Sequence, residues 1–495
     1  MERINVGIIG CGRISDLHYP GYKSGGEARV YAVCDSDAAT AARRKKEWKA
    51  VKSYTDYREL LADRAVDAVE VLTPHHAHEE QAVAAARSGK HISLQKPMTV
   101  SLESADRIIG AASGTGKIFK VSDNYLFYPP LVLAKKIIEN GGIGEPTNLR
   151  IKFISGTGGW DVPAASWEWR MKERTAGRPF QTFDHGHHLW AAAWYLLGGM
   201  EKIKAWIDSL DGILDCPAYV MWKYRGGARY GSCDYAHAAG LNIPSRYYAN
   251  DEWFEITGSR GIILVRRCTG NVLAGPVVSV FNGKTWKHHA VPSDWGEGFI
   301  GSTRNFIASI RGEDTPLLSG EQAREILKID FAIQRSSRLR RDVYLDEMDR
   351  RLPSLYAWRM RRREKKADPL RPAKPGRAGS GAARYAPRAA GLTRELMKRF
   401  DPAAAAGWNC AIGLHLTSEA GVPEARFALS VKNGRAELKE GWLPADAALT
   451  LIIPAGTWAA ILLGKKRIEM ALIQGKIKFE GRAEEGLRLR SVFHL

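Results

Sequence analysis

The first quarter of the chain alternates short apolar runs with segments of mixed polarity. The apolar runs predict buried strands over residues 4–9, 30–34, 68–72, 92–94 and 119–121. Between them the spacing of apolar positions predicts helices over residues 38–48, 57–63, 76–88 and 101–112, after a helix-like segment that follows Gly12. Buried strands that alternate with helices are typical of a parallel, doubly wound sheet. We therefore predict an α/β domain over residues 1–123.

From residue 124 onward the pattern changes to longer, alternating strands beside a few helices. Helices are predicted over residues 131–140, 184–197 and 321–338, the first of them stopped by Gly141-Gly142. Strands are predicted over residues 219–224, 228–235, 253–257 and 261–265. Consecutive strands of this kind favour an antiparallel sheet, so residues 124–354 are predicted to form an α+β domain.

A basic stretch rich in proline, glycine and alanine covers residues 355–391 and is predicted to be a linker. Beyond it, residues 392–495 are predicted to form a third, small α+β domain. Its predicted strands are residues 410–417, 425–431, 436–439, 447–453 and 476–480, and its predicted helices are residues 457–463 and 484–493. Asn433-Gly434 is the hairpin turn signal between the second and third of these strands.

The overall composition fits a globular, multidomain protein. The chain has 495 residues, of which 45% are hydrophobic and 26% charged, so two or three domains are expected. The six cysteines show no CxxC pair or metal-ligand spacing, which favours a reduced, cytoplasmic protein without structural zinc. The chain enters a strand almost at once, so no signal peptide is expected, and no apolar run approaches the roughly 20 residues that span a bilayer.

The formal net charge of +19 is concentrated in the linker, where nine lysines and arginines lie between Arg359 and Arg377. Such a run attracts nucleic acid or anionic lipid in some proteins. A solvated, flexible linker is the favoured explanation, and no nucleic-acid-binding module accompanies the run. We therefore expect no nucleic-acid partner.

A dinucleotide fingerprint lies at the start of the chain. Gly10-x-Gly12-x-x-Ser15 follows the first predicted strand and opens a helix, which places a pyrophosphate at the helix N-terminus. Asp35 at the end of the second strand is placed to accept the ribose hydroxyls and to repel a 2′-phosphate, so NAD is favoured over NADP. The basic cluster at residues 43–46 is expected on a solvated helix face.

Two further clusters carry candidate chemistry. Lys96 ends an apolar strand beside Pro97, where its side chain is placed to reach a nicotinamide ring and a substrate hydroxyl. Asp184-x-Gly186-x-His188 places a carboxylate and a histidine four residues apart, on one side of a predicted helix. A helix N-cap and a core histidine would explain that spacing as well, but with Lys96 present we predict His188 as a general base.

Thr73-Pro74-His75-His76-Ala77-His78 closes the predicted strand at 68–72, at the sheet edge where ligands bind in α/β folds. Three histidines in six residues raise the question of a metal. Their spacing is not that of a metal-binding helix with a carboxylate, and the start of a helix explains them. We predict no metal site.

The order of these motifs resembles the Gfo/Idh/MocA oxidoreductase family over residues 4 to about 345. The carrying segments are GCGRIS, Asp35, TPHHAHEEQAVAAARSGKHISLQKP, a Trp-Arg pair and DHGHH. The resemblance implies a Rossmann domain followed by an open, mainly antiparallel sheet that mediates dimers or tetramers. It also implies NAD(P)-dependent hydride transfer at a carbinol carbon of a sugar or cyclitol. By this resemblance the catalytic residues are Lys96, Asp184 and His188, and the cofactor-binding residues are Gly10, Gly12, Arg13, Ile14, Asp35, Thr73, Pro74, His78, Gln95 and Lys96.

Three positions depart from the family pattern. Gln95 stands where glutamate is usual, Ala191 where a second acidic residue is common, and Arg178-Pro179-Phe180 where glycines usually precede the aspartate. These departures leave the hydride chemistry possible, but they leave the substrate open.

The last domain resembles the sterol carrier protein 2-like (SCP2-like) fold over about residues 392–495. The resemblance rests on Gly464-Lys465-Lys466 and on the segment MALIQGKIKFEG at 470–481. It implies a lipid-binding tunnel, which the apolar segments at 449–453 and 458–463 would suit. An ordinary core or an oligomerisation domain without a ligand remains the alternative.

These observations predict an NAD(P)-dependent oxidoreductase acting on the CH–OH group of a sugar- or cyclitol-like substrate, with a hydrophobic group held by the last domain. Two alternatives stay open. One is NAD-dependent glycoside cleavage through transient oxidation and elimination. The other is a lipid-binding or scaffold protein whose Rossmann domain only senses NAD.

Overall fold

A computed structural model of the chain describes residues 3–349 and 382–494. Within these ranges Ser24, Asp161, Pro163, Asp211, Cys268, Leu273, Arg467, Glu469, Met470, residues 472–475 and Ala483 are not described. Most of the predicted linker, residues 355–381, therefore lies outside the described residues. Regular structure begins before residue 391, where the linker was predicted to end. Residues 383–388 form a 3-10 helix, and α12 follows at Ala389–Glu395.

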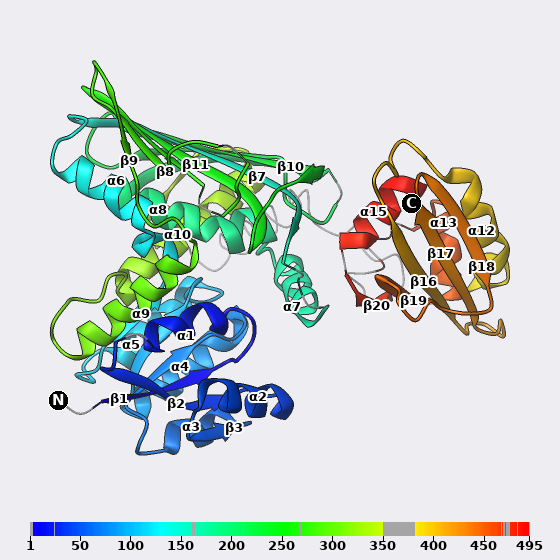
Figure 1. Cartoon of the computed structure of the whole chain (residues 1–495), viewed down its shortest axis with the longest axis horizontal. Coiled ribbons are helices and arrows are strands. Elements are labelled where there is room, and N and C mark those ends of the chain that lie inside the picture. Colours follow the sequence, from blue (N-terminus) through cyan, green and yellow to red (C-terminus); the bar gives the residue numbers. More distant parts are fainter. Residues whose placement is uncertain are drawn as a thin grey trace. The chain divides into compact units, whose positions relative to one another are not determined.

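The N-terminal part of the chain is the predicted parallel, doubly wound sheet (Figure 1). Six parallel strands lie in the order β3-β2-β1-β4-β5-β6. They are β1 (Ile4–Ile9), β2 (Ala28–Cys34), β3 (Lys52–Tyr54), β4 (Ala68–Val71), β5 (His91–Gln95) and β6 (Phe119–Ser122). The strand order reverses between β1 and β4. In open α/β sheets this switch point leaves a crevice at the carboxyl ends of the strands, where ligands bind.

Helices cover both faces of this sheet. Buried residues of α1 (Ser15–Lys23), α2 (Ala38–Trp48) and α9 (Gly296–Ile310) pack with those of the strands on one face. On the other face lie α3 (Tyr57–Ala62), α4 (His78–Arg87) and α5 (Leu102–Ala112). The helix predicted over 76–88 is divided, because a 3-10 turn at His75–Ala77 precedes α4. The edge strand β3, which is short and largely exposed, was not predicted.

The second sheet has nine strands in the order β14-β13-β12-β11-β7-β10-β9-β8-β15 and is mainly antiparallel, as predicted. Its strands are β7 (Pro146–Gly159), β8 (Met200–Ile207), β9 (Ala218–Tyr224), β10 (Tyr230–Asn242), β11 (Tyr248–Gly258), β12 (Gly261–Arg266), β13 (Val278–Phe281), β14 (Trp286–His289) and β15 (Val343–Tyr344). The exception is the pairing of β7 with β10, which is parallel. One face packs on helices α6 (Pro129–Glu139), α8 (Gly186–Leu197) and α10 (Gly320–Leu339) (Figure 1).

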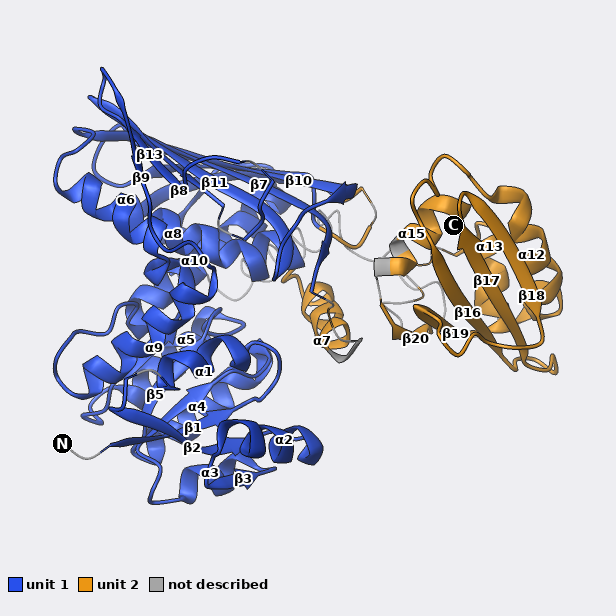
Figure 2. Cartoon of the chain, viewed as in Figure 1, with its two compact units in different colours: residues 1–160, 180–208, 215–369 blue, residues 161–179, 209–214, 370–495 orange. Residues whose placement is uncertain are grey.

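Contacts divide the chain into two compact units (Figure 2). Unit 1 contains both sheets described above. Unit 2 contains residues 370–495 together with two segments from within the earlier part of the chain, residues 161–179 and 209–214. Helix α7 (Ala164–Thr175) therefore belongs to unit 2. The predicted division into residues 1–123, 124–354, 355–391 and 392–495 stays a prediction.

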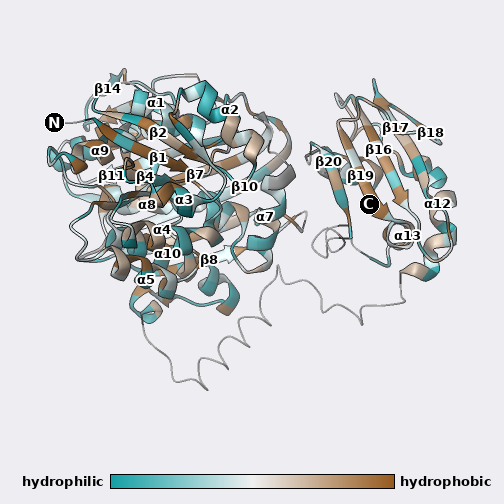
Figure 3. Cartoon of the chain, turned by 90° about the horizontal axis from the view of Figure 1, so that it is seen from below, coloured by the Kyte–Doolittle hydropathy of each residue, from teal (hydrophilic) through white to brown (hydrophobic). Residues whose placement is uncertain are grey.

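The C-terminal part of unit 2 is a five-stranded sheet in the order β18-β17-β16-β19-β20. Its elements are β16 (Cys410–Thr417), β17 (Ala425–Lys432), β18 (Arg435–Glu440), β19 (Leu449–Pro454), α13 (Ala455–Leu462), β20 (Lys478–Gly481) and α15 (Glu484–Phe493). Figure 3 shows many hydrophobic residues, in brown, along the strands of this sheet. With Trp458 and Leu462 of α13, the buried ones form a separate hydrophobic core. Of the helices in the described part of the chain, none has the length and apolarity needed to cross a membrane.

Candidate active site

The glycine loop after β1 has the geometry that a dinucleotide requires. Gly10 has a φ of +91°, and an added Cβ would lie 2.9 Å from the carbonyl carbon of Leu72, so only glycine fits. At Gly12 an added Cβ would meet nothing within 4 Å, which leaves open space over the backbone at the start of α1. Ser15 is buried and its hydroxyl donates to the carbonyl of Gly12 at 2.5 Å. This loop fits a pyrophosphate at the helix N-terminus.

Asp35 lies at the carboxyl end of β2, where the ribose of a dinucleotide is expected. Its Oδ2 accepts from the backbone N–H of Cys11 at 2.8 Å, and its Oδ1 accepts from that of Asp37 at 3.0 Å. A carboxylate oxygen accepts two hydrogen bonds, so each oxygen keeps one position for a ribose hydroxyl. The two backbone contacts hold the carboxylate in place for that role.

Arg44 corrects the expectation that the basic cluster at 43–46 lies on a solvated face. Its side chain is buried, and its Nε donates to the carbonyl of Cys11 at 3.2 Å. Its guanidinium also pairs with Asp16 and Glu47. The other three members of the cluster are exposed. Because two carboxylates neutralise Arg44, it supports the glycine loop rather than offering a free charge to a 2′-phosphate.

The other predicted cofactor residues surround the same edge of the sheet. Arg13 is exposed and its guanidinium lies 5.2 Å from the ring centre of Trp160, while Ile14 packs on the core beside α1. The hydroxyl of Thr73, next to Pro74, donates to Gln81 at 2.6 Å. His78 is buried, and its ring nitrogens face the carbonyls of Thr73 at 2.8 Å and Pro97 at 3.0 Å. His78 thereby ties the loop after β4 to the loop after β5.

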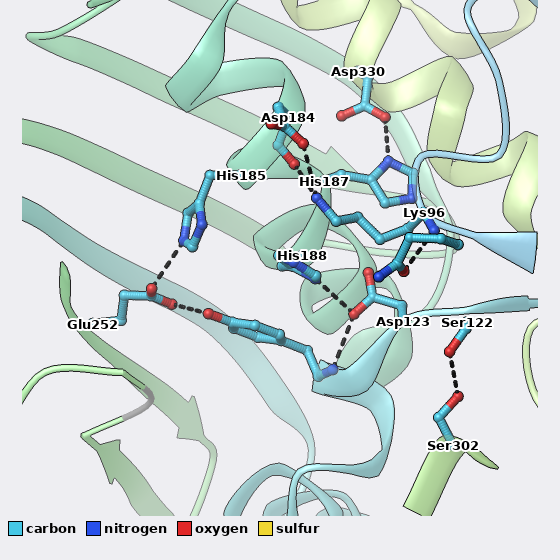
Figure 4. A network of polar contacts seen from close by, with 12 residues as sticks. Lys96, Ser122, Asp123, Asp184, His185, His187, His188, Glu252, Ser302 and Asp330 are labelled. Atoms are coloured by element: carbon cyan, nitrogen blue, oxygen red, sulfur yellow. Dashed lines mark hydrogen bonds and ion pairs between the residues drawn. The ribbon is translucent and has the colours of Figure 1, made fainter. Parts of the chain in front are cut away.

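Lys96 and Asp184 meet although 88 positions separate them in the sequence (Figure 4). Nζ of Lys96 donates to Oδ1 of Asp184 at 3.0 Å and to its backbone carbonyl at 2.7 Å. His75 Nε2 lies 3.5 Å from the same carboxylate oxygen. The end of β5 thus presents a lysine held by a carboxylate at the carboxyl edge of the parallel sheet.

Asp184 does not sit on the regular helix that was predicted over 184–197. Residues Phe180–His185 form a π-helical segment, and α8 begins only at Gly186. The carboxylate of Asp215 accepts from the backbone N–H groups of Gln181 at 2.8 Å and Thr182 at 2.7 Å, and from the Thr182 hydroxyl at 2.5 Å. These bonds hold the segment in its wider turn, which carries Asp184 to Lys96.

His188 has a different carboxylate partner from the one that its spacing predicted. Its Nδ1 lies 2.9 Å from Oδ1 of Asp123, which directly follows β6. The Asp123 oxygen also accepts from the backbone N–H of Tyr125 at 2.9 Å, and the Tyr125 ring stacks on His188 with centres 4.6 Å apart. Asp123, a residue that sequence reasoning missed, therefore orients the predicted base. The signal available was its place at the carboxyl end of a parallel strand.

The electrostatics of this pair favour a neutral histidine beside an ionised aspartate. Burial lowers the pKa of His188 to about 4; Asp123 raises it and Lys96 lowers it further. For Asp123, burial raises the pKa, but attraction to His188 and the hydrogen bonds outweigh burial and bring it to about 2. With Nδ1–H donated to Asp123, the Nε2 lone pair of His188 is the one left to accept a proton.

Two more histidine–carboxylate pairs lie close by (Figure 4). Glu252 on β11 is fully buried; its Oε1 lies 2.9 Å from His185 Nε2 and its Oε2 accepts from the Tyr125 hydroxyl at 2.8 Å. His187 Nδ1 lies 2.5 Å from Asp330 of α10, and both residues are fully buried. Burial raises the pKa of Asp330 to about 6, although His187 lowers it. Nothing in the sequence spacing pointed to Glu252 or Asp330.

The structure also describes Gln95 and Ala191, two of the positions that depart from the family pattern. Oε1 of Gln95 accepts from the backbone N–H of Lys96 at 2.9 Å, and Ala191 is buried in α8. In the part of the chain that the structure describes, no group of three or more histidines, cysteines or carboxylates has the geometry to hold a metal ion.

Comparison with known proteins places this chain in a family. Residues 4–123 match the model of an oxidoreductase family described as an NAD-binding Rossmann fold, and residues 135–345 match the C-terminal alpha/beta domain of the same family, Gfo/Idh/MocA. Residues 394–494 match the SCP-2 sterol transfer family.

Among similar proteins, myo-inositol 2-dehydrogenase of Thermotoga maritima is 25% identical, over 70% of this chain and 99% of its own length. The NAD(+)-dependent scyllo-inositol 2-dehydrogenase of Bacillus subtilis is 27% identical, over 70% of this chain and 97% of its own. Levoglucosan dehydrogenase, solved with NADH and levoglucosan, has a TM-score of 0.59 at 23% identity and covers 70% of this chain and all of its own, a likeness of fold. The chain is a Gfo/Idh/MocA-family NAD-binding oxidoreductase that carries an SCP2-family domain at its C-terminal end.

Proposed function

We propose that the protein is a dehydrogenase or reductase that exchanges a hydride between NAD and a carbinol carbon of a sugar- or cyclitol-like substrate. The observation that carries this proposal is the meeting of Lys96, Asp184 and the His188–Asp123 pair at one sheet edge. That edge is the one at which the glycine loop and Asp35 lie. NADP is expected to be the poorer cofactor because Asp35 opposes a 2′-phosphate.

Bound NAD supplies a two-electron acceptor, and the side chains supply the proton chemistry. Lys96, held by Asp184, donates a hydrogen bond to the substrate oxygen and orients the carbinol. Neutral His188 accepts the hydroxyl proton at Nε2 as the carbonyl forms. Asp123 fixes the tautomer that leaves Nε2 free and stabilises the imidazolium that results.

The substrate class is supported by the relatives, which are named for inositols and for levoglucosan. A test is to incubate the full chain with NAD and a panel of myo-inositol, scyllo-inositol, levoglucosan and D-apiose, and to follow NADH by its absorbance. The reverse direction uses NADH and the corresponding keto compounds. We expect turnover with at least one member of the panel. A protein that binds NADH but turns over none of them in either direction contradicts the proposed substrate class.

We further propose that the C-terminal domain holds an apolar ligand, either a hydrophobic group of the substrate or a separate lipid. Its match to the SCP-2 family and the burial of the apolar residues of α13 in the core of this domain support this. Mass spectrometry of small molecules released from the purified protein is expected to find NAD or NADH together with a retained lipid.

The outer face of the nine-stranded sheet supports a proposal of self-association. Trp206 and Tyr219 are partners in register on β8 and β9, and their side chains remain 47% and 42% exposed. Met221, two residues further along β9, is 37% exposed. Exposed apolar patches of this kind mark interaction surfaces, so we propose a homodimer or homotetramer formed through this face. Light scattering is expected to show a dimer or tetramer that Tyr219→Lys dissociates.

A second candidate function is glycoside cleavage by transient oxidation and elimination. The Glu252–His185 pair favours this function because it offers a second base. The ring centre of His185 lies 5.7 Å from that of His188. Oxidation acidifies the neighbouring carbon, and His185 is placed to take that proton while a β-substituent leaves. Turnover in heavy water separates the two functions. After elimination, water adds to the enone, that carbon takes a proton from the solvent, and the hydride returns to the carbonyl. Deuterium is therefore incorporated at that carbon without net NADH, whereas the dehydrogenase forms one NADH per product and incorporates none.

A further inference from the structure

A row of buried polar side chains crosses the parallel sheet beneath Lys96. Glu70 of β4, Ser93 of β5 and Lys120 of β6 are paired in register, so their side chains share one face of the sheet. All three are at most 1% exposed. Gln95 follows Ser93 by two residues and therefore lies on the same face, and His18 of α1 covers it. Buried polar side chains of this kind nearly always have at least one hydrogen-bond partner.

The contacts form a continuous chain that ends at the lysine. His18 Nδ1 lies 2.9 Å from Oε1 of Glu70, which also accepts from the Ser93 hydroxyl at 3.1 Å. His18 Nε2 lies 3.4 Å from the amide nitrogen of Gln95. The amide oxygen of Gln95 accepts from the backbone N–H of Lys96 at 2.9 Å.

The donors and acceptors of this chain have a single consistent arrangement. The backbone N–H of Lys96 is a donor, so Gln95 must present its oxygen to Lys96 and its NH₂ group to His18. His18 Nε2 must then be an unprotonated acceptor, which puts the ring proton on Nδ1, facing Glu70. Every link runs in the same direction, from the Lys96 backbone to the Glu70 carboxylate, with His18 neutral.

The charges around the chain agree with an ionised Glu70. Burial raises the pKa of Glu70, but its interactions with His18, Tyr22 and Ser93 outweigh burial, and the net direction is downward. Lys120 at the other end of the row donates to Asn305 and to the backbone of Ser302, both at 3.0 Å. Lys120 is the basic group in register with Glu70, on the other side of Ser93.

We propose that Glu70, His18 and Gln95 are positioning residues that set the backbone at Lys96, and that the amide at position 95 keeps His18 neutral. The proposal rests on the role of Lys96 in the proposed function. It also explains why glutamine replaces the usual glutamate: with Glu70 present, a second carboxylate would enclose His18 between two negative charges. Because α1 begins at the glycine loop, the same chain joins the cofactor helix to the strand that carries Lys96.

The first experiment needs no substrate, so it stands apart from the proposed function. Nitrogen NMR of histidine-labelled full chain, with His18→Gln to assign the signal, distinguishes the two neutral tautomers from imidazolium. We expect the Nδ1–H tautomer in the natural protein, imidazolium in Gln95→Glu, and the Nε2–H tautomer in the exchanged double variant Glu70→Gln/Gln95→Glu. A charged His18 or an Nε2–H tautomer in the natural protein overturns the proposal.

The second experiment measures kcat with NAD and whichever of myo-inositol, scyllo-inositol and levoglucosan is turned over. Gln95→Glu is expected to lower kcat roughly 10- to 100-fold, as for a misplaced catalytic group. Glu70→Gln keeps an acceptor for Nδ1–H and is expected to retain kcat, and the double variant is expected to recover most of it. Glu103→Gln, an exposed glutamate of α5, is the matched control. A double variant as slow as Gln95→Glu, at equal thermal stability and NADH affinity, rules out the positioning role.

Discussion

Nδ1 of His188 lies 2.9 Å from the Asp123 carboxylate, which fixes the ring so that Nε2 is its free acceptor. The two residues are 65 positions apart, on α8 and after β6. The stacked Tyr125 ring closes one side of the imidazole. An aspartate that holds a neutral histidine in one tautomer is the arrangement expected of a general base.

Replacing Asp123 by asparagine is expected to lower kcat roughly 10²-fold or more, because the tautomer is no longer fixed and the imidazolium loses its counter-charge. The pH profile should move as well. Asp123 raises the pKa of His188 against burial, so its loss shifts the acidic limb, which lies near pH 4, to lower pH. Initial rates from pH 3 to 8 check both effects. An acidic limb that moves to higher pH contradicts this account.

Lys96→Ala and His188→Ala are each expected to reduce turnover by roughly 10²–10⁴-fold while NADH binding stays nearly intact. In the proposed function both side chains act at the carbinol, whereas Gly10, Gly12 and Asp35 hold the cofactor. Turnover and NADH fluorescence titrations separate the two effects. His289→Ala on the edge strand β14 is the control. Near-normal turnover of His188→Ala removes that histidine from the mechanism.

Asp35→Ser is expected to narrow the preference for NAD over NADP, because it removes the negative charge that repels a 2′-phosphate. Arg44 is already neutralised by Asp16 and Glu47, so it cannot reverse that preference in the natural protein. Binding of the two reduced cofactors, measured side by side, is the check. Tighter binding of NADPH than NADH by the unaltered chain would show that Asp35 does not set the preference.

Lys120→Met is expected to change how stability depends on pH. Burial lowers the pKa of Lys120 from 10.5 to about 7, so between these values the unfolded chain binds a proton that the folded chain has lost. The free energy of unfolding of the natural protein therefore rises with pH over that range, relative to the methionine variant. Below pH 7 Lys120 is charged in both states, and the full cost of burying that charge lowers the free energy of unfolding. Melting temperatures from pH 6 to 10 measure the difference. A difference in melting temperature between the two proteins that does not change with pH excludes a neutral buried amine at Lys120.

Deleting residues 382–495 is expected to spare NADH binding, because unit 1 contains both sheets and its own core. Turnover of a substrate with an apolar group should fall, since binding energy from remote substrate parts is lost. A fluorescent fatty-acyl probe should bind the full chain, and Leu462→Arg, within the apolar helix α13, should weaken it. If no apolar probe binds and the deletion breaks the oligomer instead, the domain serves assembly.

Most of the parallel sheet could be predicted because its signals are local. The strand at 4–9, the helix at 38–48 and the closing helix at 484–493 are found with the predicted bounds. The central strand β7 was missed, although Leu149, Ile151 and Phe153 are buried and alternate with Arg150 and Lys152. That alternation of buried and exposed positions is itself a local strand signal.

The partners of the site histidines could not be predicted in the same way. Sequence spacing joined Asp184 to His188, but the structure joins Asp184 to Lys96 and His188 to Asp123. Glu252 lies 67 positions from His185 and Asp330 lies 143 positions from His187. Contacts at such separations depend on the packing of β11 against the π-helical segment and of α10 against α8, which no local pattern encodes.

The Asp215 contact with Gln181 and Thr182 also determines where the chain tolerates change. Residues 161–179 and residues 209–214 belong to unit 2. The chain returns to unit 1 at Phe180 after the first segment and at Asp215 after the second. The hydrogen bonds from Gln181 and Thr182 to Asp215 join these two points, and all three residues belong to unit 1. Lengthening or exchanging either segment therefore need not move Asp184, so both stretches are expected to accept insertions and replacements that leave unit 1 unchanged.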